Sequence, residues 1–341
     1  MKQQVLKTIA TSAAAIAITL GAFPGTAQTI MAGKGRVARK HSSPLTRGAG
    51  HIPPPGASPY TFTYFGFPRA PFTGAYSINS GASTPRIDMV GAYGSPSQDG
   101  YGNGFLLQVG ESKGTITEAF STLNIPGETL QEADGINDSG QIVGNYIDSS
   151  NNAEGYLLSG GIFTPIQATS LGATSTLPEG INNDGDIVGL YEVNGNGIAQ
   201  GFELSGGVYT SLSYPGAPET QAVSINNKGD IVGFYFDTAE AYHGFLLSGG
   251  TYTSIDVPGA VGTFAYGIND SGTIVGVYCT TSGCLTNNDG AQGFLLSAGT
   301  FTTINVPSAT ATILNNINDK GVLVGQYYDC DGLGLGLIAT P

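Results

Sequence analysis

Several residue types on which metal centres and active sites depend are scarce in this sequence. Its 341 residues include no tryptophan, three histidines and three cysteines. His243 is the only histidine after residue 58, which excludes a histidine site repeated along the chain. No CxxC or Cys/His spacing indicates zinc, and there is no GxSxG elbow, P-loop or dinucleotide fingerprint. The sequence therefore predicts no zinc site and supports no recognised catalytic chemistry.

Basic residues are also few, and they are unevenly placed. The chain has 12 Lys and Arg against 25 Asp and Glu, a formal net charge of −13. All 25 acidic residues follow residue 58, where only five basic residues accompany them, so that part carries −20. Nucleic-acid partners are excluded, because phosphate backbones are bound by clustered Lys and Arg. The charge favours neutral ligands, cations or basic partners, and solubility in an exported protein explains it equally well.

Long apolar runs are missing after the N-terminus, so we expect no transmembrane span. Residues 1–27 resemble a secretory signal peptide, with Lys2 and Lys7 before an apolar stretch and small residues at 25–27 as a cleavage site. Ala32 marks a second candidate cleavage site. A membrane anchor is the alternative, but the apolar stretch is short and contains Ser and Thr. We therefore expect a secreted protein, extracellular or at the cell surface.

Residues 28–58 have a composition of their own. They contain five basic residues, no acidic residue and the run Pro53-Pro54-Pro55. A segment this polar cannot bury enough apolar surface to order itself, which predicts a basic Pro/Gly-rich disordered linker. Contact of its basic residues with an anionic cell envelope is a further interpretation.

The three cysteines fit an oxidising compartment. Cys279 and Cys284 bracket the loop TTSG, which predicts a local disulfide. Cys330 is left over, and its pairing with the neighbouring loop stays open.

A repeated string dominates the rest of the chain. INDSGTIVGVY, which begins at Ile268, recurs in related forms such as INNKGDIVGFY, and the glycines of the VG pairs are 43 to 53 residues apart. Self-similarity at this period indicates one structural unit stacked on itself. The six copies are anchored at residues 78, 136, 181, 225, 268 and 317, of which the first is the loosest.

One copy, residues 219–260, is predicted to contain four strands. TQAVSIN, DIVGFYF, GFLLS and TYTSIDVPG are separated by the turn NNKG, the loop DTAEAYH and the turn SGG. Asn first and Gly fourth in NNKG predict a type I turn followed by a left-handed residue. Another copy has Ser297-Ala298-Gly299 in place of SGG. Because alanine resists positive φ, we predict a type I turn closed by a glycine bulge there too.

These features predict an all-β fold, a six-bladed β-propeller of four-stranded antiparallel blades over residues 59–341. Near-continuous apolar runs in the second and third strands indicate burial on both faces. TFTYFGFPRA (61–70) aligns with TYTSIDVPGA (251–260), and the last copy ends without a fourth strand. The N-terminal strand is therefore predicted to complete the last blade, which removes an exposed edge. A linear solenoid is the alternative.

The tight turns and the longer connections alternate, so they are expected on opposite faces, here called the tight-turn face and the long-loop face. Binding residues concentrate on variable loops over a rigid scaffold, which makes the long-loop face the candidate. A tyrosine closes the second strand of every copy beside the variable loop. These rings are candidates to stack on sugars, and packing between blades is the alternative: Tyr93, Tyr146, Tyr191, Tyr235, Tyr278 and Tyr327.

Three further residues are candidates for ligand binding. Asp134 and Glu179 occupy the same position, just before Gly-Ile-Asn, and are expected to make the channel mouth acidic. They could bind a hard cation such as calcium or form an acid/base pair, and a solvated acidic rim is the alternative. His243 is the third candidate. Other copies have Asn103, Glu154, Gln200 and Gln292 at its position, which favours a local hydrogen bond over a general base.

The pairing of INDSGxIVG with HGFLLSGG (243–250) resembles the HAF family of bacterial extracellular repeat proteins, over roughly residues 60–341. The chain departs from that pattern in having Gly244 for alanine, a single copy with the histidine and no tryptophan. The resemblance implies an exported repeat protein, but it does not imply any particular activity. The layout also looks like a kelch propeller, as an architectural analogy.

We therefore predict a secreted, monomeric, non-catalytic module that binds an extracellular glycan or protein ligand through its long-loop face. One alternative is a polysaccharide lyase or hydrolase with an acidic site at the channel mouth. The other is a structural protein of the cell-envelope surface, held there by the basic linker.

Overall fold

The computed structural model describes residues 59–67, 70–80, 86–94, 102–112, 115–125, 128–149, 152–193 and 198–341. The predicted signal peptide (1–27) and linker (28–58) lie outside these residues. Within the described ranges, no helix has the length and apolar character needed to cross a membrane.

The copy at residues 219–255 shows how each repeat folds. β14 (Glu219–Ile225), β15 (Ile231–Phe236), β16 (Tyr242–Ser248) and β17 (Thr251–Ile255) pair antiparallel in chain order. The apolar residues of IVGFYF are buried along β15, as expected for a strand covered on both sides. The four predicted strands are therefore confirmed in this copy.

The other copies repeat this order. First strands are β2 (Thr73–Ile78), β6 (Thr129–Ile136), β10 (Ser175–Ile181), β18 (Gly262–Ile268) and β22 (Ala311–Ile317). Second strands are β3 (Arg86–Gly94), β7 (Ile142–Ile147), β11 (Ile187–Glu192), β19 (Ile274–Cys279) and β23 (Leu323–Tyr328). Third strands are β4 (Gly102–Ser112), β8 (Ala153–Ser159), β12 (Ala199–Ser205), β20 (Gln292–Ser297) and β24 (Gly334–Thr340). Fourth strands are β5 (Thr115–Thr122), β9 (Ile162–Ile166), β13 (Val208–Leu212), β21 (Thr300–Thr303) and, from the N-terminus, β1 (Thr61–Phe65).

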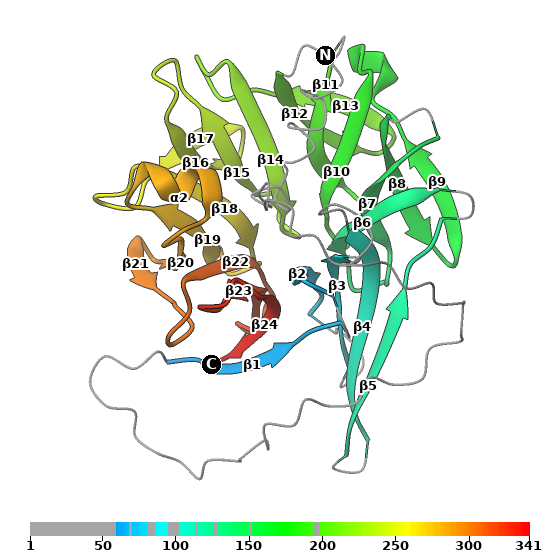
Figure 1. Cartoon of the computed structure of the whole chain (residues 1–341). Coiled ribbons are helices and arrows are strands. Elements are labelled where there is room, and N and C mark those ends of the chain that lie inside the picture. The colour runs from blue at the N-terminus through cyan, green and yellow to red at the C-terminus, as the bar shows by residue number, and fades with distance from the viewer. Residues whose placement is uncertain are drawn as a thin grey trace.

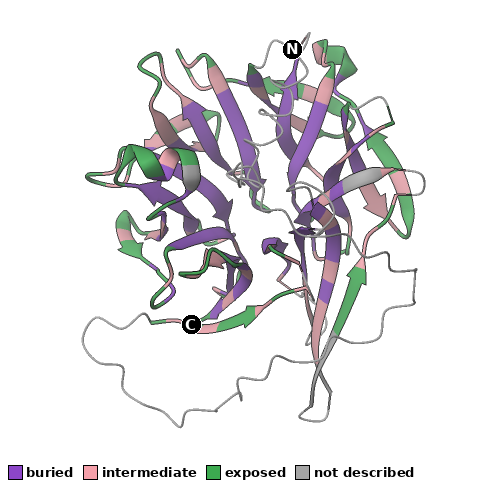
Figure 2. Ribbon diagram, in the orientation of Figure 1, coloured by how far each residue is buried: buried purple, intermediate pink, exposed green. Residues whose placement is uncertain are grey.

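The first strands surround a central axis (Figure 1). Each contacts the first strand of the next copy, and β22 contacts β2, so the circle is closed. Buried residues concentrate on the strands near the axis, whereas the outer strands are largely exposed (Figure 2). The chain is thus an all-β propeller, and a linear solenoid is excluded.

The number of separate sheets differs from the prediction of six. Among the described residues, four sheets have four strands each, and a fifth has eight, from β14 to β21. The eight-stranded sheet arises because the backbone of Tyr242, at the start of β16, pairs in parallel with Gly262, at the start of β18. A glycine allows this approach because it has no side chain to hold the strands apart.

The N-terminal strand closes the ring as predicted. β1 pairs antiparallel with β24, from Thr61 opposite Thr340 to Phe65 opposite Gly336. The sheet therefore runs β1-β24-β23-β22, with strands from both ends of the chain. The outer edge of β24, which would otherwise be free, is covered by β1.

The two tight turns use different conformations. The NNKG turn has Gly229 at φ +78°, the left-handed residue that the sequence predicts. In the SGG turn both Gly249 and Gly250 have positive φ, as do Ala298 and Gly299. Positive φ at both central positions is the signature of a type I′ turn, so the predicted type I turn with a bulge is wrong. The type I′ turn prevails because its twist matches that of the paired strands, even at the expense of a left-handed alanine.

Replacing Ala298 with glycine is expected to stabilise the protein. Ala298 has φ +48°, which costs an L-residue about 1 kcal/mol that glycine does not incur. We expect Ala298→Gly to raise the free energy of unfolding by roughly 0.5–1 kcal/mol in urea titrations. Gly299→Ala, which adds the same strain next door, should lower it. An Ala298→Gly variant no more stable than wild type, or a Gly299→Ala variant no less stable, would contradict the turn assignment.

Short helices occur in two of the connections. A 3₁₀ turn, η1, covers Thr169–Leu171, and helix α2 covers Ser282–Asn287. Cys279, at the end of β19, and Cys284, in α2, form the predicted disulfide. Both cysteines are buried in an apolar cluster with Phe264, so the bond holds α2 beside the start of β18. Cys330 is exposed and has no disulfide partner.

Candidate functional site

The first strands place equivalent side chains on the central axis. Each contributes the residue two positions before the Ile of its Ile-Asn pair. Together with Asn316 these residues line a small cavity of about 10 Å³, room for about one water-sized particle. They are Tyr76, Asp134, Glu179, Val223, Tyr266 and Asn315.

Asp134 and Glu179 lie inside the molecule, not on a rim. Their exposed fractions are 6% and 4%, so the predicted acidic channel mouth and solvated rim are wrong for these two residues. Alternation along the strand explains the difference, because the residue before Gly-Ile-Asn faces the axis well below the turn. The sequence pattern identified the shared position but not its depth.

Burial raises the pKa of Asp134 well above its ordinary value, and the nearby charges of Glu179 and Glu132 raise it further. A hydrogen bond of 2.8 Å, in which Asn145 Nδ2 donates to Asp134 Oδ2, acts in the opposite direction. Burial also raises the pKa of Glu132 to about 7. The same carboxylates raise the pKa of Tyr76, which burial already places well above the ordinary value. The axis is therefore a region of strongly interacting acidic groups.

The cavity also contains polar residues that the sequence reasoning missed. Asn315 is 3% exposed, and its Nδ2 donates to the Ala75 carbonyl at 2.8 Å, yet its Oδ1 has no hydrogen-bond partner. Gln221 Oε1, two residues before Val223 on β14, is likewise buried without a partner, although Gln221 does not line the cavity. Aligning all six copies at the position of Asp134 would have found Tyr76 and Asn315.

At the tight-turn face, the repeated asparagines link the copies. In the five turns that the structure describes in full, the Asn Oδ1 accepts two backbone N–H groups of its own turn, as Asn226 does from Lys228 and Asp230. Its Nδ2 donates to the backbone carbonyl of the next copy's asparagine. These links run from Asn137 to Asn182, Asn226, Asn269, Asn318 and finally Asn79, at 3.0 to 3.3 Å.

The residues that directly follow these asparagines in the sequence form a second, closed circle of hydrogen bonds, here called the Asx belt. Each backbone N–H donates to a side-chain oxygen of the neighbouring copy, at 2.8 to 3.1 Å. In order of donation the belt is Asp138, Asn183, Asn227, Asp270, Asp319 and Ser80, which donates back to Asp138. Belt and asparagines together line an open cavity of about 70 Å³ at the tight-turn end of the axis.

The tyrosines that close the second strands are engaged in packing and local hydrogen bonds. Tyr235 is 8% exposed, and its hydroxyl lies 3.2 Å from Ser254 Oγ. One face of its ring stacks on Tyr214 at 3.7 Å and the other lies 5.0 Å from the His243 ring. Tyr93, Tyr191 and Tyr278 are buried similarly, whereas Tyr146 and Tyr327 are half-buried. The four buried rings therefore do not present an open face to a sugar.

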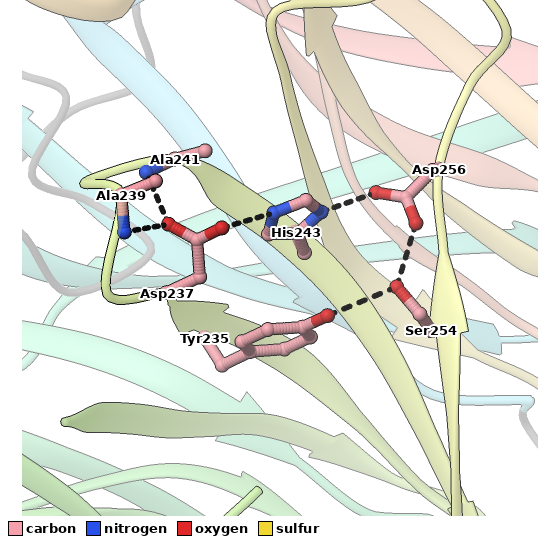
Figure 3. Close-up of polar contacts among 7 residues, drawn as sticks. All are labelled: Tyr235, Asp237, Ala239, Ala241, His243, Ser254 and Asp256. Carbon is pink, nitrogen blue, oxygen red and sulfur yellow. Dashed lines mark hydrogen bonds and ion pairs between the residues drawn. The ribbon is translucent and has the colours of Figure 1, made fainter. Parts of the chain in front are cut away.

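His243 lies between two carboxylates at the long-loop face (Figure 3). Its Nδ1 is 2.7 Å from Asp256 Oδ1 and its Nε2 is 3.3 Å from Asp237 Oδ2. Ser254 Oγ donates to Asp256 Oδ2 at 2.6 Å instead of to the imidazole. These residues therefore do not form a Ser-His-Asp relay, in which the serine hydroxyl must contact the histidine.

Metal-binding groups of the usual kind are not found in the described ranges. No three His, Cys, Asp or Glu side chains there are placed to hold one ion. Acidic side chains by themselves therefore do not form a calcium site in this part of the chain.

Comparisons with known proteins support the fold. No family model matches the chain, so membership of the HAF family is not supported, and no curated protein matches either. A mutant of AofleA from Arthrobotrys oligospora superposes with a TM-score of 0.50 at 12% identity, covering 82% of this chain and 86% of that one. A variant of the Aleuria aurantia lectin bound to Fucα1-6GlcNAc superposes with a TM-score of 0.46 at 14% identity, covering 79% of this chain and 93% of that one. The β-propeller domain of the Trilobed protease from Pyrococcus furiosus superposes with a TM-score of 0.45 at 11% identity, covering 79% of this chain and 94% of that one.

Proposed function

We propose that this protein is a secreted, non-catalytic binding module whose long-loop face takes an extracellular glycan or protein ligand. One observation carries the proposal. At the start of the third strand and just after the fourth, each of four copies places a different pair of hydrogen-bonded polar side chains. The pairs are Glu154–Gln167, Gln200–Ser213, His243–Asp256 and Gln292–Asn305.

These pairs have the properties of recognition groups. They occupy equivalent places on a rigid repeated scaffold and all four are exposed. They also differ in chemistry, whereas the asparagines of the tight-turn face are the same in every copy because each is needed to link the copies. Variable groups over a constant scaffold are the general arrangement of binding surfaces.

The chemistry of the pairs indicates the ligand class. Carboxylates, amides and an imidazole hydrogen-bond well to the hydroxyl groups of sugars and to the backbone of a peptide. The formal charge of −20 after residue 58 disfavours anionic ligands. We therefore infer a neutral glycan or a basic protein segment, met outside the cell if residues 1–27 direct export.

The enzyme alternative receives no support from Asp134 and Glu179. Both line a cavity of about 10 Å³, which cannot admit a sugar ring. A general base at His243 would have to act while both ring nitrogens face carboxylates.

We also infer that the ring consists of six blades. The eight-stranded sheet divides naturally between β17 and β18, because a single residue pair, Tyr242 with Gly262, joins its halves. Each half has the strand order of the other four sheets. The six first strands in a closed circle support the same division.

Binding of the full-length protein to a glycan array and to cell-wall preparations tests the function. We expect a ligand whose affinity falls by about tenfold or more in the double variant His243→Ala/Asp256→Ala, since two hydrogen-bonding groups are lost. Lys228→Ala, on the tight-turn face, is the control and should bind normally. Absence of any ligand above background, or equal binding by the double variant for every ligand found, would overturn the proposal for this face.

A further inference from the structure

The axial cavity contains acidic groups with no basic group to balance them. Its lining includes Asp134 and Glu179 and no Lys, Arg or His. Two carboxylates in one buried cavity are costly because their charges repel each other, and the hydrogen bond from Asn145 to Asp134 does not remove this repulsion. The repeat does not require them, because Val223 fills the equivalent place in another copy. A ligand would explain why acidic residues occur here.

A second feature of the cavity points to a ligand independently of the carboxylates. Asn315 lines the cavity, is 3% exposed, and has an Oδ1 atom without a hydrogen-bond partner. Such an orphaned buried acceptor destabilises the fold unless a ligand occupies the site opposite. Its amide nitrogen is already used by the Ala75 carbonyl, so the oxygen is the atom left for a ligand.

A second, larger cavity lies next to the inner one on the axis. Asn316 lines both the inner cavity and the outer cavity of about 70 Å³. The two cavities are therefore neighbours along the axis. The outer one is ringed by the carboxylates of Asp138, Asp270 and Asp319 in the Asx belt. A mouth of this sign concentrates cations and repels anions.

We propose that the inner axial cavity binds one small hard cation, with the carboxylates of Asp134 and Glu179 and the Oδ1 atom of Asn315 as protein ligands. All three ligands coordinate through oxygen, which selects hard divalent ions such as Ca²⁺ or Mg²⁺ over soft transition metals. The size of the cavity admits an ion and excludes organic ligands. The site is separate from the binding surface proposed above and does not depend on it.

Thermal unfolding of the full-length protein, stripped with chelator and refilled with CaCl₂ or MgCl₂, tests the site. We expect one of the two ions to raise Tm by about 5–10 °C at 100 times its Kd, because it binds only the folded state. Glu179→Gln and Asp134→Asn keep the shape of each side chain and remove its charge, and both should abolish the increase. Glu203→Gln is the matched control, since Glu203 on β12 lines neither axial cavity. Elemental analysis of the refilled proteins should find about one ion per chain in the wild type and the control.

The outcomes separate the possibilities. No increase in Tm and no bound ion in the wild type would overturn the proposal. So would equal increases in all four proteins, which would place the ion elsewhere, for example at the Asx belt. If Glu179→Gln fails to fold, Asp134→Asn decides by the same comparison, and circular dichroism shows which variants are folded.

Discussion

Replacing Gly233 with alanine is expected to unfold the protein or to destabilise it by at least about 3–5 kcal/mol. Gly233 is the glycine of the VG pair in β15, and a Cβ atom there would overlap the backbone carbonyl oxygen of Gln221 on β14. The register of β14 shifts between Ala222 and Ser224, which directs that carbonyl onto the glycine. Because the obstacle is backbone in a paired strand, no side-chain rotation relieves the overlap.

The same close approach recurs in every copy. Cβ atoms on the other VG glycines would also overlap a backbone carbonyl of the first strand: Gly91, Gly144, Gly189, Gly276 and Gly325. This explains why the VG pair is constant among copies whose loops differ.

Two control substitutions separate overlap from other effects of alanine. Gly216→Ala meets no atom within 4 Å but has φ +83°, so it should cost only about 1–2 kcal/mol of strain. Gly283→Ala lies in α2 with ample space and helical backbone, and should be neutral or stabilising by up to about 1 kcal/mol. Urea titrations followed by circular dichroism give all three values. If Gly233→Ala were no worse than Gly216→Ala, the close approach at β14 would be disproved.

Replacing Asn226 with alanine is expected to cost about 3–5 kcal/mol of unfolding free energy. The side chain accepts backbone N–H bonds from Lys228 and Asp230 at 3.0 and 2.9 Å, and donates to the Asn269 carbonyl at 3.2 Å. It is only 4% exposed, so water does not replace these bonds well. The substitution would leave two donors and one acceptor unsatisfied at the link between copies.

Asn227→Ala is the matched control for this prediction. Asn227 is the next residue, its side chain takes part in the Asx belt, and it is exposed, so solvent can replace its bonds. We expect a loss below about 1 kcal/mol for this variant. Hydrogen exchange at the backbone amides of Lys228 and Asp230 should accelerate only in Asn226→Ala. Equal losses for the two variants would show that the asparagine link contributes no more than a surface contact.

Much of the fold was predictable because its signals are local. The turn NNKG specifies a hairpin through one asparagine and one glycine, and Gly229 has the positive φ that it requires. A fourth strand within residues 61–70 was predicted from its likeness to another copy, and β1 at residues 61–65 pairs with β24. The SGG turn was mispredicted, because Ala298 was taken as evidence against positive φ, whereas the twist of the paired strands imposes it.

The candidate sites were less predictable. Asp134 and Glu179 were recognised as equivalent, yet their burial depends on how closely six strands approach one axis. His243 was expected to make a local hydrogen bond, but its partner Asp256 lies 13 residues away and was not identified. An alignment of the copies gives the position of each residue along its strand but no distances between residues. It could therefore show which residues are equivalent, but not that Asp134 and Glu179 are buried or that His243 contacts Asp256.

The sequence by itself determined the repeat, the four strands of each copy and the closing of the ring by residues 61–65. These features follow from short-range sequence patterns, which recur in each copy with small variations. Only the tertiary structure decided that Asp134 and Glu179 meet Tyr76 and Asn315 in one small cavity, and that Tyr242 and Gly262 join two copies into one sheet. The physical reason is that convergence on an axis depends on the radius and packing of the whole ring, which no single copy encodes.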